Sequence, residues 1–130
     1  MNRIAKSGLA YWAVIFALGF VLGTVRTLWG AEALGEARFI LIEVPVMLLA
    51  SFAAAHWLTR RFGIASTGAA LGMGAFAFAL LMAAEIALSA MLGLSARLWI
   101  SGLLAPPGLY GFLGQIAFGL MPVLARPHAE

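Results

Sequence analysis

Four polar side chains stand inside long apolar segments of this chain: Arg26, Glu43, Glu85 and Gln115. At a rise of ~1.5 Å per residue, they lie ~4, ~7, ~10 and ~11 Å from the ends of their segments. If these segments cross a membrane, all four side chains fall near the same boundary. An unpaired charge at that depth is costly, so such groups face a bundle interior, pair with one another or contact water. We therefore expect the four residues to form one polar intramembrane cluster.

Residues of these types can form ion pairs and can exchange protons. One Arg against two Glu leaves a net negative charge if both carboxylates ionise, which favours keeping a proton on one of them. Glu85 is the better candidate for protonation, because apolar residues flank it on both sides. Glu43 is the expected ion-pair partner of Arg26, since the connection between their two segments is short.

Two interpretations of this cluster stay open. In the functional one, a carboxylate near the outer face binds a cation or couples proton movement to a substrate. In the structural one, Arg26, Glu43 and Gln115 satisfy each other and fix the register of the helices.

Other site chemistries find little support in the sequence. There is no Cys, and the two His residues, His56 and His128, are far apart, so we expect no metal site and no cofactor. No nucleophile, base and metal-ligand set shares one face, and the chain is therefore predicted not to be an enzyme. Its basic residues are scattered at segment ends, which argues against a nucleic-acid partner.

Composition places these residues in a membrane protein. Apolar residues make up 64% of the chain and charged residues 10%, against roughly a quarter charged in soluble domains. At about 20 apolar residues per crossing, 130 residues suit four spans in a single membrane domain, 1–130. We predict an all-α fold, a transmembrane four-helix bundle whose first partner is the lipid bilayer.

The apolar segments set the expected helices at about 8–29, 38–58, 64–92 and 108–124. The third is longer than one crossing requires, so tilt or protrusion should absorb the excess. Between the third and fourth, the stretch 94–107 contains Arg97, Trp99, Pro106 and Pro107. This composition is typical of an interfacial turn or a short surface helix.

Basic residues near the segment ends predict that both termini are cytoplasmic, N-in/C-in. That orientation places five basic residues inside: Arg3, Lys6, Arg60, Arg61 and Arg126. It leaves three outside: Arg26, Arg38 and Arg97. Aromatic residues form two interfacial belts under the same assignment. The inner belt contains Tyr11, Trp12 and Trp57, and the outer one Trp29, Trp99 and Tyr110.

Small residues mark the faces through which the helices are expected to pack, because lipid offers no hydrophobic force between helices. Residues four apart share a helix face. The predicted packing positions are Gly19, Gly23, Gly68, Gly72, Gly111 and Gly119. So many Gly and Ala faces also favour a homo-oligomer or association with a larger membrane complex.

At GTVRTLWG, IEVPVMLLASF and GMGAFAFALLMAAEIAL the sequence resembles a group of small, uncharacterised bacterial inner-membrane proteins with four predicted spans. The resemblance implies a multi-pass protein of the bacterial plasma membrane and implies no activity. In size the chain is also similar to small multidrug-resistance transporters. Their essential carboxylate lies in the first helix, where this chain has none, so their function is not carried over.

These observations favour a small polytopic membrane protein with a structural, accessory or oligomer-forming role. The alternative hypothesis is a small proton- or cation-coupled transporter or channel that uses the outward-facing carboxylates Glu43 and Glu85. The position of Glu85 discriminates between them. A place beside Arg26, Glu43 and Gln115 around a water-accessible cavity favours transport, and a place facing lipid or another protomer favours assembly.

Overall fold

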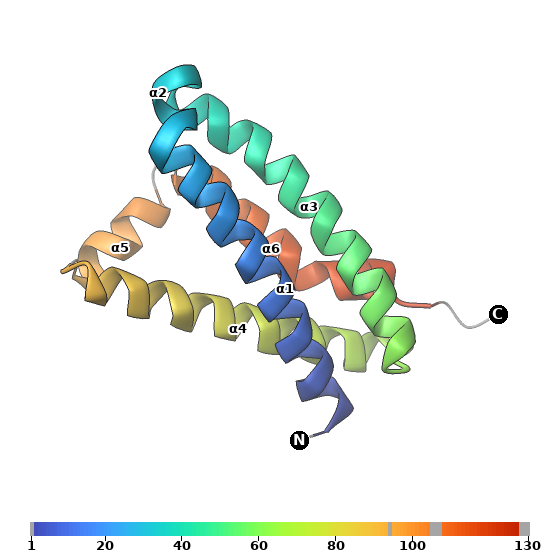
Figure 1. Ribbon diagram of the computed structural model, residues 1–130. Helices are drawn as coiled ribbons and strands as arrows, with labels where there is room; N and C mark the ends of the chain where they lie inside the picture. Colours follow the sequence, from blue (N-terminus) through green and yellow to red (C-terminus); the bar gives the residue numbers. More distant parts are fainter. Residues whose placement is uncertain (1, 94, 105–107, 128–130) are drawn as a thin grey trace.

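The computed structural model describes residues 2–93, 95–104 and 108–127, and every element in these ranges is helical (Figure 1). The helices are α1 (Arg3–Val25), a π-helical turn η1 (Arg26–Gly30), α2 (Ala31–Leu34), α3 (Glu36–Arg61), α4 (Thr67–Met91), α5 (Ala96–Leu103) and α6 (Gly108–Ala125). The predicted all-α class is confirmed.

Side-chain caps fix where three of the helices begin. Asn2, Ser66 and Ser95 each accept a hydrogen bond from the backbone N–H three residues further along the chain, which satisfies one of the free donors of a first helical turn. As a result α1 begins five residues before its predicted start at 8, and α4 begins three residues after its predicted start at 64. Because capping residues lie outside the apolar pattern, hydropathy alone misplaced the starts of both α1 and α4.

Within residues 2–93, 95–104 and 108–127, three helices are apolar and long enough to cross a membrane: Arg3–Trp29, which joins α1 to most of η1, Arg38–Arg61 in α3, and Thr67–Met91, which is α4. The fourth predicted span, α6, has 18 residues and is a shorter apolar helix over Leu109–Ala125. The chain is therefore a helical membrane protein with three apolar helices of full spanning length.

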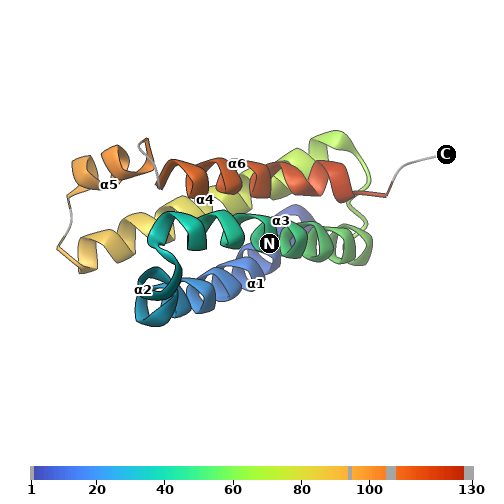
Figure 2. The same cartoon turned by 90° about the horizontal axis from the view of Figure 1, so that it is seen from above.

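The four long helices form a ring. α1 packs against α3 and α4, and α6 packs against the same two helices, which gives the order α1, α3, α6, α4. Figures 1 and 2 show that the start of α1, the α3–α4 turn and the end of α6 lie at one end of the bundle, with α2 and α5 at the other. We call these the terminal end and the distal end.

The terminal end is tightly packed. A Cβ atom at Gly8 of α1 would lie 3.0 Å from the carbonyl oxygen of Met73 in α4, and one at Gly74 would overlap the carbonyl group of Gly119 in α6. Glycine at these positions lets α4 approach both neighbours at backbone distance. The core residues are Tyr11, Ile15, Ala55, Leu58, Ile64, Ala70, Met73, Ala77, Leu81, Phe118 and Ala125.

A proline explains one contact in this core. Pro122 of α6 has no N–H, so it cannot bond the carbonyl of Phe118 four residues earlier. The Tyr11 hydroxyl donates to that carbonyl at 2.6 Å, and the two rings stack with centroids 4.3 Å apart. Tyr11 is completely buried. Its predicted place in the inner aromatic belt is therefore wrong, because it supplies the hydrogen bond that Pro122 removes from α6.

The remaining belt residues and the connection after α4 agree in part with the sequence prediction. Trp29 in η1 and Trp57 near the end of α3 are exposed, whereas the side chain of Trp99 lies outside the part that the structure describes. α5 occupies the middle of the predicted interfacial segment 94–107 as a short surface helix, and Leu98 on it is exposed. The two ends of that segment, residues 94 and 105–107, lie outside the described residues.

Candidate functional site

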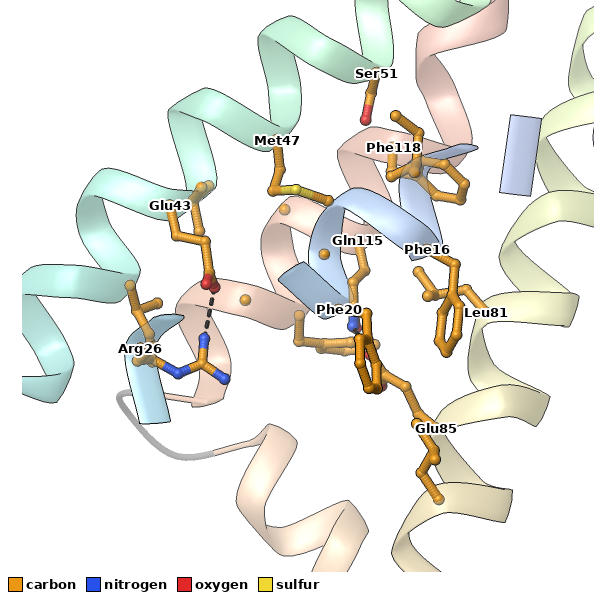
Figure 3. Close-up of a pocket in the computed structure, with 18 residues that line it drawn as sticks. Phe16, Phe20, Arg26, Glu43, Met47, Ser51, Leu81, Glu85, Gln115 and Phe118 are labelled. Atoms are coloured by element: carbon orange, nitrogen blue, oxygen red, sulfur yellow. Dashed lines mark hydrogen bonds and ion pairs between the residues drawn. The ribbon is translucent and has the colours of Figure 1, made fainter. Parts of the chain in front are cut away.

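A cavity of about 420 Å³ lies within the distal half of the bundle, and Arg26, Glu43, Glu85 and Gln115 all line it (Figure 3). They come from four different elements, η1, α3, α4 and α6 respectively. The structure therefore brings together the four residues that the sequence predicted to converge. Arg26 and Gln115 are 89 residues apart in sequence, and the ring arrangement of the helices places them on one cavity.

Arg26 and Glu43 form an ion pair. The guanidinium Nη1 donates to Glu43 Oε2 at 2.6 Å, a short distance that is typical of a charge-assisted hydrogen bond. The side chains are 28% and 15% exposed. The sequence favoured Glu43 over Glu85 as the partner of Arg26, and Glu43 is the residue that pairs with Arg26 in the structure.

Glu85 is held by an amide instead of a cation. Gln115 Nε2 donates to Glu85 Oε1 across the α4–α6 interface. Among the described residues no basic side chain forms an ion pair with Glu85. The cavity therefore carries one neutralised carboxylate, at Glu43, and one carboxyl group without a counter-charge, at Glu85.

Three buried oxygen atoms that belong to cavity-lining residues make no hydrogen bond with the described part of the chain: Glu43 Oε1, Gln115 Oε1 and Ser51 Oγ. Ser51 is 1% exposed. Figure 3 shows its hydroxyl oxygen directed toward the space between Met47 and Phe118. Buried polar atoms are nearly always hydrogen-bonded, so three unpartnered oxygens on one cavity indicate a place for a polar ligand or water.

Sequence reasoning did not select Ser51. Ser51 lies four residues after Met47 and eight after Glu43, both of which line the cavity. Steps of four residues keep side chains on one helix face. A search for hydroxyl groups at repeated steps of four residues from Glu43 would therefore have found it.

The rest of the cavity wall is apolar. It includes four phenylalanines, Phe16 and Phe20 from α1 and Phe112 and Phe118 from α6. Phe20 is 61% exposed, so this side of the cavity is close to the outer surface of the bundle. A mostly apolar cavity of 300–1,000 Å³ with a few polar groups is typical of a small-molecule binding site.

Two local features at the junction of α1 and η1 accompany the position of Arg26. The hydroxyls of Thr24 and Thr27 donate to the carbonyls of Phe20 and Gly23, each four residues earlier. Such bonds compete with the helix ladder, and the chain widens here from α-helical to π-helical geometry. The widened turn begins at Arg26, which lines the cavity.

The six predicted packing glycines divide into three groups of two. Gly72 and Gly119 contact neighbouring helices, with Ile4 Cγ2 at 3.2 Å and Phe78 Cβ at 3.5 Å from the respective Cβ positions. Gly19 faces only the flexible end of Met47 on α3, at 3.4 Å, and Gly23 faces Arg26 Nη2, at 3.7 Å.

Gly68 and Gly111 are not packing positions within this bundle, because no described atom lies within 4 Å of a Cβ built at either one. Gly111 lines the cavity instead. The closest helix approaches involve Gly8 and Gly74, which the sequence did not select as packing positions. A GxxxG pattern reports the spacing of small residues and not which helix face meets a neighbour.

No protein-family model, curated protein or solved structure matches this chain. The inference of function therefore rests on the cavity and on its position in the bundle.

Proposed function

We propose that this protein is a small multi-pass transporter of the bacterial plasma membrane that binds its solute in the distal cavity. The observation that carries the proposal is the position of Glu85, which lies with Gln115 on the same cavity as the Arg26–Glu43 pair. A carboxyl group that faces a cavity instead of lipid can bind a cation or exchange a proton.

Four spans are part of this proposal. α6 has 18 residues, which is ~27 Å of helix and falls within the range of about 17–25 residues for spanning helices. It packs against α3 and α4 in the ring. An even number of crossings also suits a bundle in which the first turn of α1 and the last turn of α6 lie at the same end.

The basic residues support an orientation with the terminal end in the cytoplasm. Arg60 Nη1 donates to the carbonyl of Ala125 at 2.9 Å, which joins the ends of α3 and α6, and Arg3 lies beside Gly63 in the α3–α4 turn. This end therefore gathers the basic residues that are expected to stay inside. The distal cavity then opens toward the outer side of the membrane.

Cysteine labelling tests both the orientation and the access to the cavity, because the chain has no native Cys. In intact cells a membrane-impermeant thiol reagent should modify Gly111→Cys, which faces open space in the cavity, and Glu32→Cys at the distal end. The reagent should spare Arg61→Cys at the terminal end and Leu120→Cys on the exposed face of α6. Labelling of Arg61→Cys without Glu32→Cys would reverse the proposed orientation.

Transport is tested in proteoliposomes that contain a trapped pH-sensitive dye. Solutes from a panel of amines, amino acids and carboxylates should move protons only in vesicles that contain the protein, and Glu85→Gln should abolish the signal. Glu32→Gln is the matched control, since it removes an exposed carboxylate that does not line the cavity. Wild-type transport by Glu85→Gln would remove Glu85 from the mechanism.

An accessory or oligomer-forming role stays the second candidate. It is favoured by a shallow apolar groove of about 270 Å³ on the outer face of α4 and α6, whose lining includes Gly74, Phe78 and Gly119. Crosslinking of Leu71→Cys to itself in native membranes tests this role, since Leu71 lines the groove and is 46% exposed. A protein that stays monomeric in lipid and captures no partner would contradict it.

A further inference from the structure

The polar atoms that face the distal cavity differ in whether they can donate or accept hydrogen bonds. Glu43 Oε1 and Gln115 Oε1 can only accept hydrogen bonds, and Ser51 Oγ can accept one while donating another. The Arg26 guanidinium and the Gln115 amide nitrogen already donate to carboxylates. Arg26 and Gln115 keep further N–H donors, but the buried atoms of the cavity lining that have no described partner are all oxygens, which a ligand with N–H groups would satisfy.

The charges around the cavity point the same way. Arg26 and Glu43 neutralise each other, and Glu85 has only the neutral Gln115 as its partner. Among the side chains that the structure describes, no other charged residue lines this cavity. Its net charge is thus zero or negative, and a cation is the charge type that it can take up without leaving an unpaired charge at depth.

The apolar wall limits how large and how polar this cation can be. At about 30 Å³ per water, 420 Å³ is the space of roughly a dozen waters or of an organic solute of similar size. The wall includes the rings of Phe16, Phe20, Phe112 and Phe118, which favour an apolar body and interact with a nearby cation through their faces. Three or more His, Cys, Asp or Glu close enough to hold a metal ion do not occur among the described residues.

We propose that the distal cavity binds a small organic ammonium ion with an apolar body. Its charge is balanced by Glu85, its N–H groups donate to buried oxygens of the cavity lining, and its apolar part lies against the phenylalanines. We place one of these N–H contacts at Ser51, whose buried hydroxyl oxygen can accept it, and Ser51 is in this view a residue that determines specificity. This inference rests on the proposed function and names the chemical class of its solute.

Four probes that share a 2-phenylethyl body test it by isothermal titration calorimetry on the full chain in detergent: 2-phenylethylammonium, its N,N,N-trimethyl derivative, 2-phenylethanol and 3-phenylpropionate. We expect the primary ammonium to bind most tightly, about tenfold better than the trimethyl compound, which has charge but no N–H. The neutral alcohol should bind more weakly still, and the carboxylate should not bind.

Two matched pairs of variants locate the site. Ser51→Ala should weaken binding of the primary ammonium about fivefold and leave binding of the trimethyl compound unchanged. Ser89→Ala is its control, because Ser89 lies outside the cavity lining. Glu85→Gln should weaken both cations at least tenfold, with Glu32→Gln as control. A monodisperse elution profile and wild-type helical circular dichroism show that each variant has folded.

The possible failures are distinguishable. If Gly111→Cys reacts with the impermeant reagent but the alcohol or the carboxylate binds best, or no probe binds, the ammonium proposal is overturned while an accessible cavity remains. If Gly111→Cys is inert in intact cells and in detergent, no solute reaches the cavity, and the proposed function fails together with this inference. Equal binding of primary and trimethyl ammonium would remove Ser51 as a determinant of specificity.

Discussion

The two ends of the bundle differ in whether their buried hydroxyl groups are hydrogen-bonded within the chain. At the terminal end, Ser7, Tyr11 and Thr59 are each completely buried, and each hydroxyl donates to a backbone carbonyl. On the cavity, Ser51 is 1% exposed, and its hydroxyl, which lies near that of Tyr11, forms no hydrogen bond of normal geometry with the described chain. At the terminal end the buried hydroxyls form hydrogen bonds within the fold. At the distal end the Ser51 hydroxyl stays available for a ligand, as a binding site requires.

The two ends also differ in how closely the backbones of neighbouring helices approach each other. Gly8 and Gly74 bring α4 into direct backbone contact with α1 and α6 at the terminal end, whereas Gly111 faces open space in the cavity. Figure 1 shows α4 crossing the other helices obliquely, as expected of a 25-residue helix that is longer than one crossing needs. The same residue type thus closes one end and leaves room at the other.

The largest effect that we predict tests this closure. In Gly74→Ala the new Cβ overlaps the Gly119 carbonyl group, and because both partners are backbone, the two helices must separate. We expect a loss of about 3 kcal/mol or more in the free energy of unfolding, measured by SDS titration in mixed micelles.

The control for this variant lies in the same helix. Gly68→Ala adds the same methyl group in open space and should change stability by less than about 1 kcal/mol, in the stabilising direction. Equal losses in the two variants would mean that α4 and α6 are not in backbone contact at Gly74.

The second prediction concerns the carbonyl that Pro122 frees. Tyr11→Phe keeps the ring stacked on Phe118 but removes its hydroxyl donor, which should cost about 1–2 kcal/mol. In a Pro122→Ala background the helix regains its own donor at residue 122, so the added cost of Tyr11→Phe should fall to near zero. A double-mutant cycle measured by SDS titration gives the coupling, and identical costs in both backgrounds would contradict it.

At the distal end the ion pair should contribute less to stability. Glu43→Gln removes the charge that Arg26 contacts, yet Arg26 is partly exposed near the end of its span and can reach the membrane surface. We expect a loss of about 1 kcal/mol, with most of it absent when Arg26→Gln is already in place. A loss as large as that of Gly74→Ala would show that the distal end also holds the fold together.

Much of the fold was predictable because apolar segment length is a strong signal in a membrane protein. The four long helices follow from hydropathy, and their ends deviate where the side chains of Asn2 and Ser66 act as caps. Which helix neighbours which was not predictable. The α4–α6 contact depends on Gly74 and Gly119, and small residues are so common here that pattern alone does not choose between faces.

The polar cluster was predictable for an energetic reason. Few strongly polar residues lie in apolar segments, and each must find a partner or water, so depth and polarity predicted that Arg26, Glu43, Glu85 and Gln115 come together. Ser51 escaped because a hydroxyl in a helix is a weak signal, since it can bond to its own backbone. Tyr11 was misjudged for a similar reason, because its role depends on Pro122, 111 residues away in sequence.

The smallest predicted effect separates the two ends most directly. Ser51→Ala removes a buried hydroxyl that bonds to no described residue, so the folded protein loses no internal hydrogen bond, and stability should change by no more than about 0.5 kcal/mol. Thr59→Val, which removes a bonded hydroxyl at the terminal end, should cost about 1 kcal/mol. Both are measured by SDS titration.

Measuring both stability and ligand binding in Ser51→Ala tests whether the hydroxyl serves the fold or the ligand. A residue whose loss leaves stability unchanged but weakens ammonium binding has its hydroxyl available for the ligand, because the fold does not use it. If Ser51→Ala instead destabilised the protein as much as Tyr11→Phe, the hydroxyl would be bonded in the folded state. The distal end would then be a second packed core, and the contrast between the two ends would disappear.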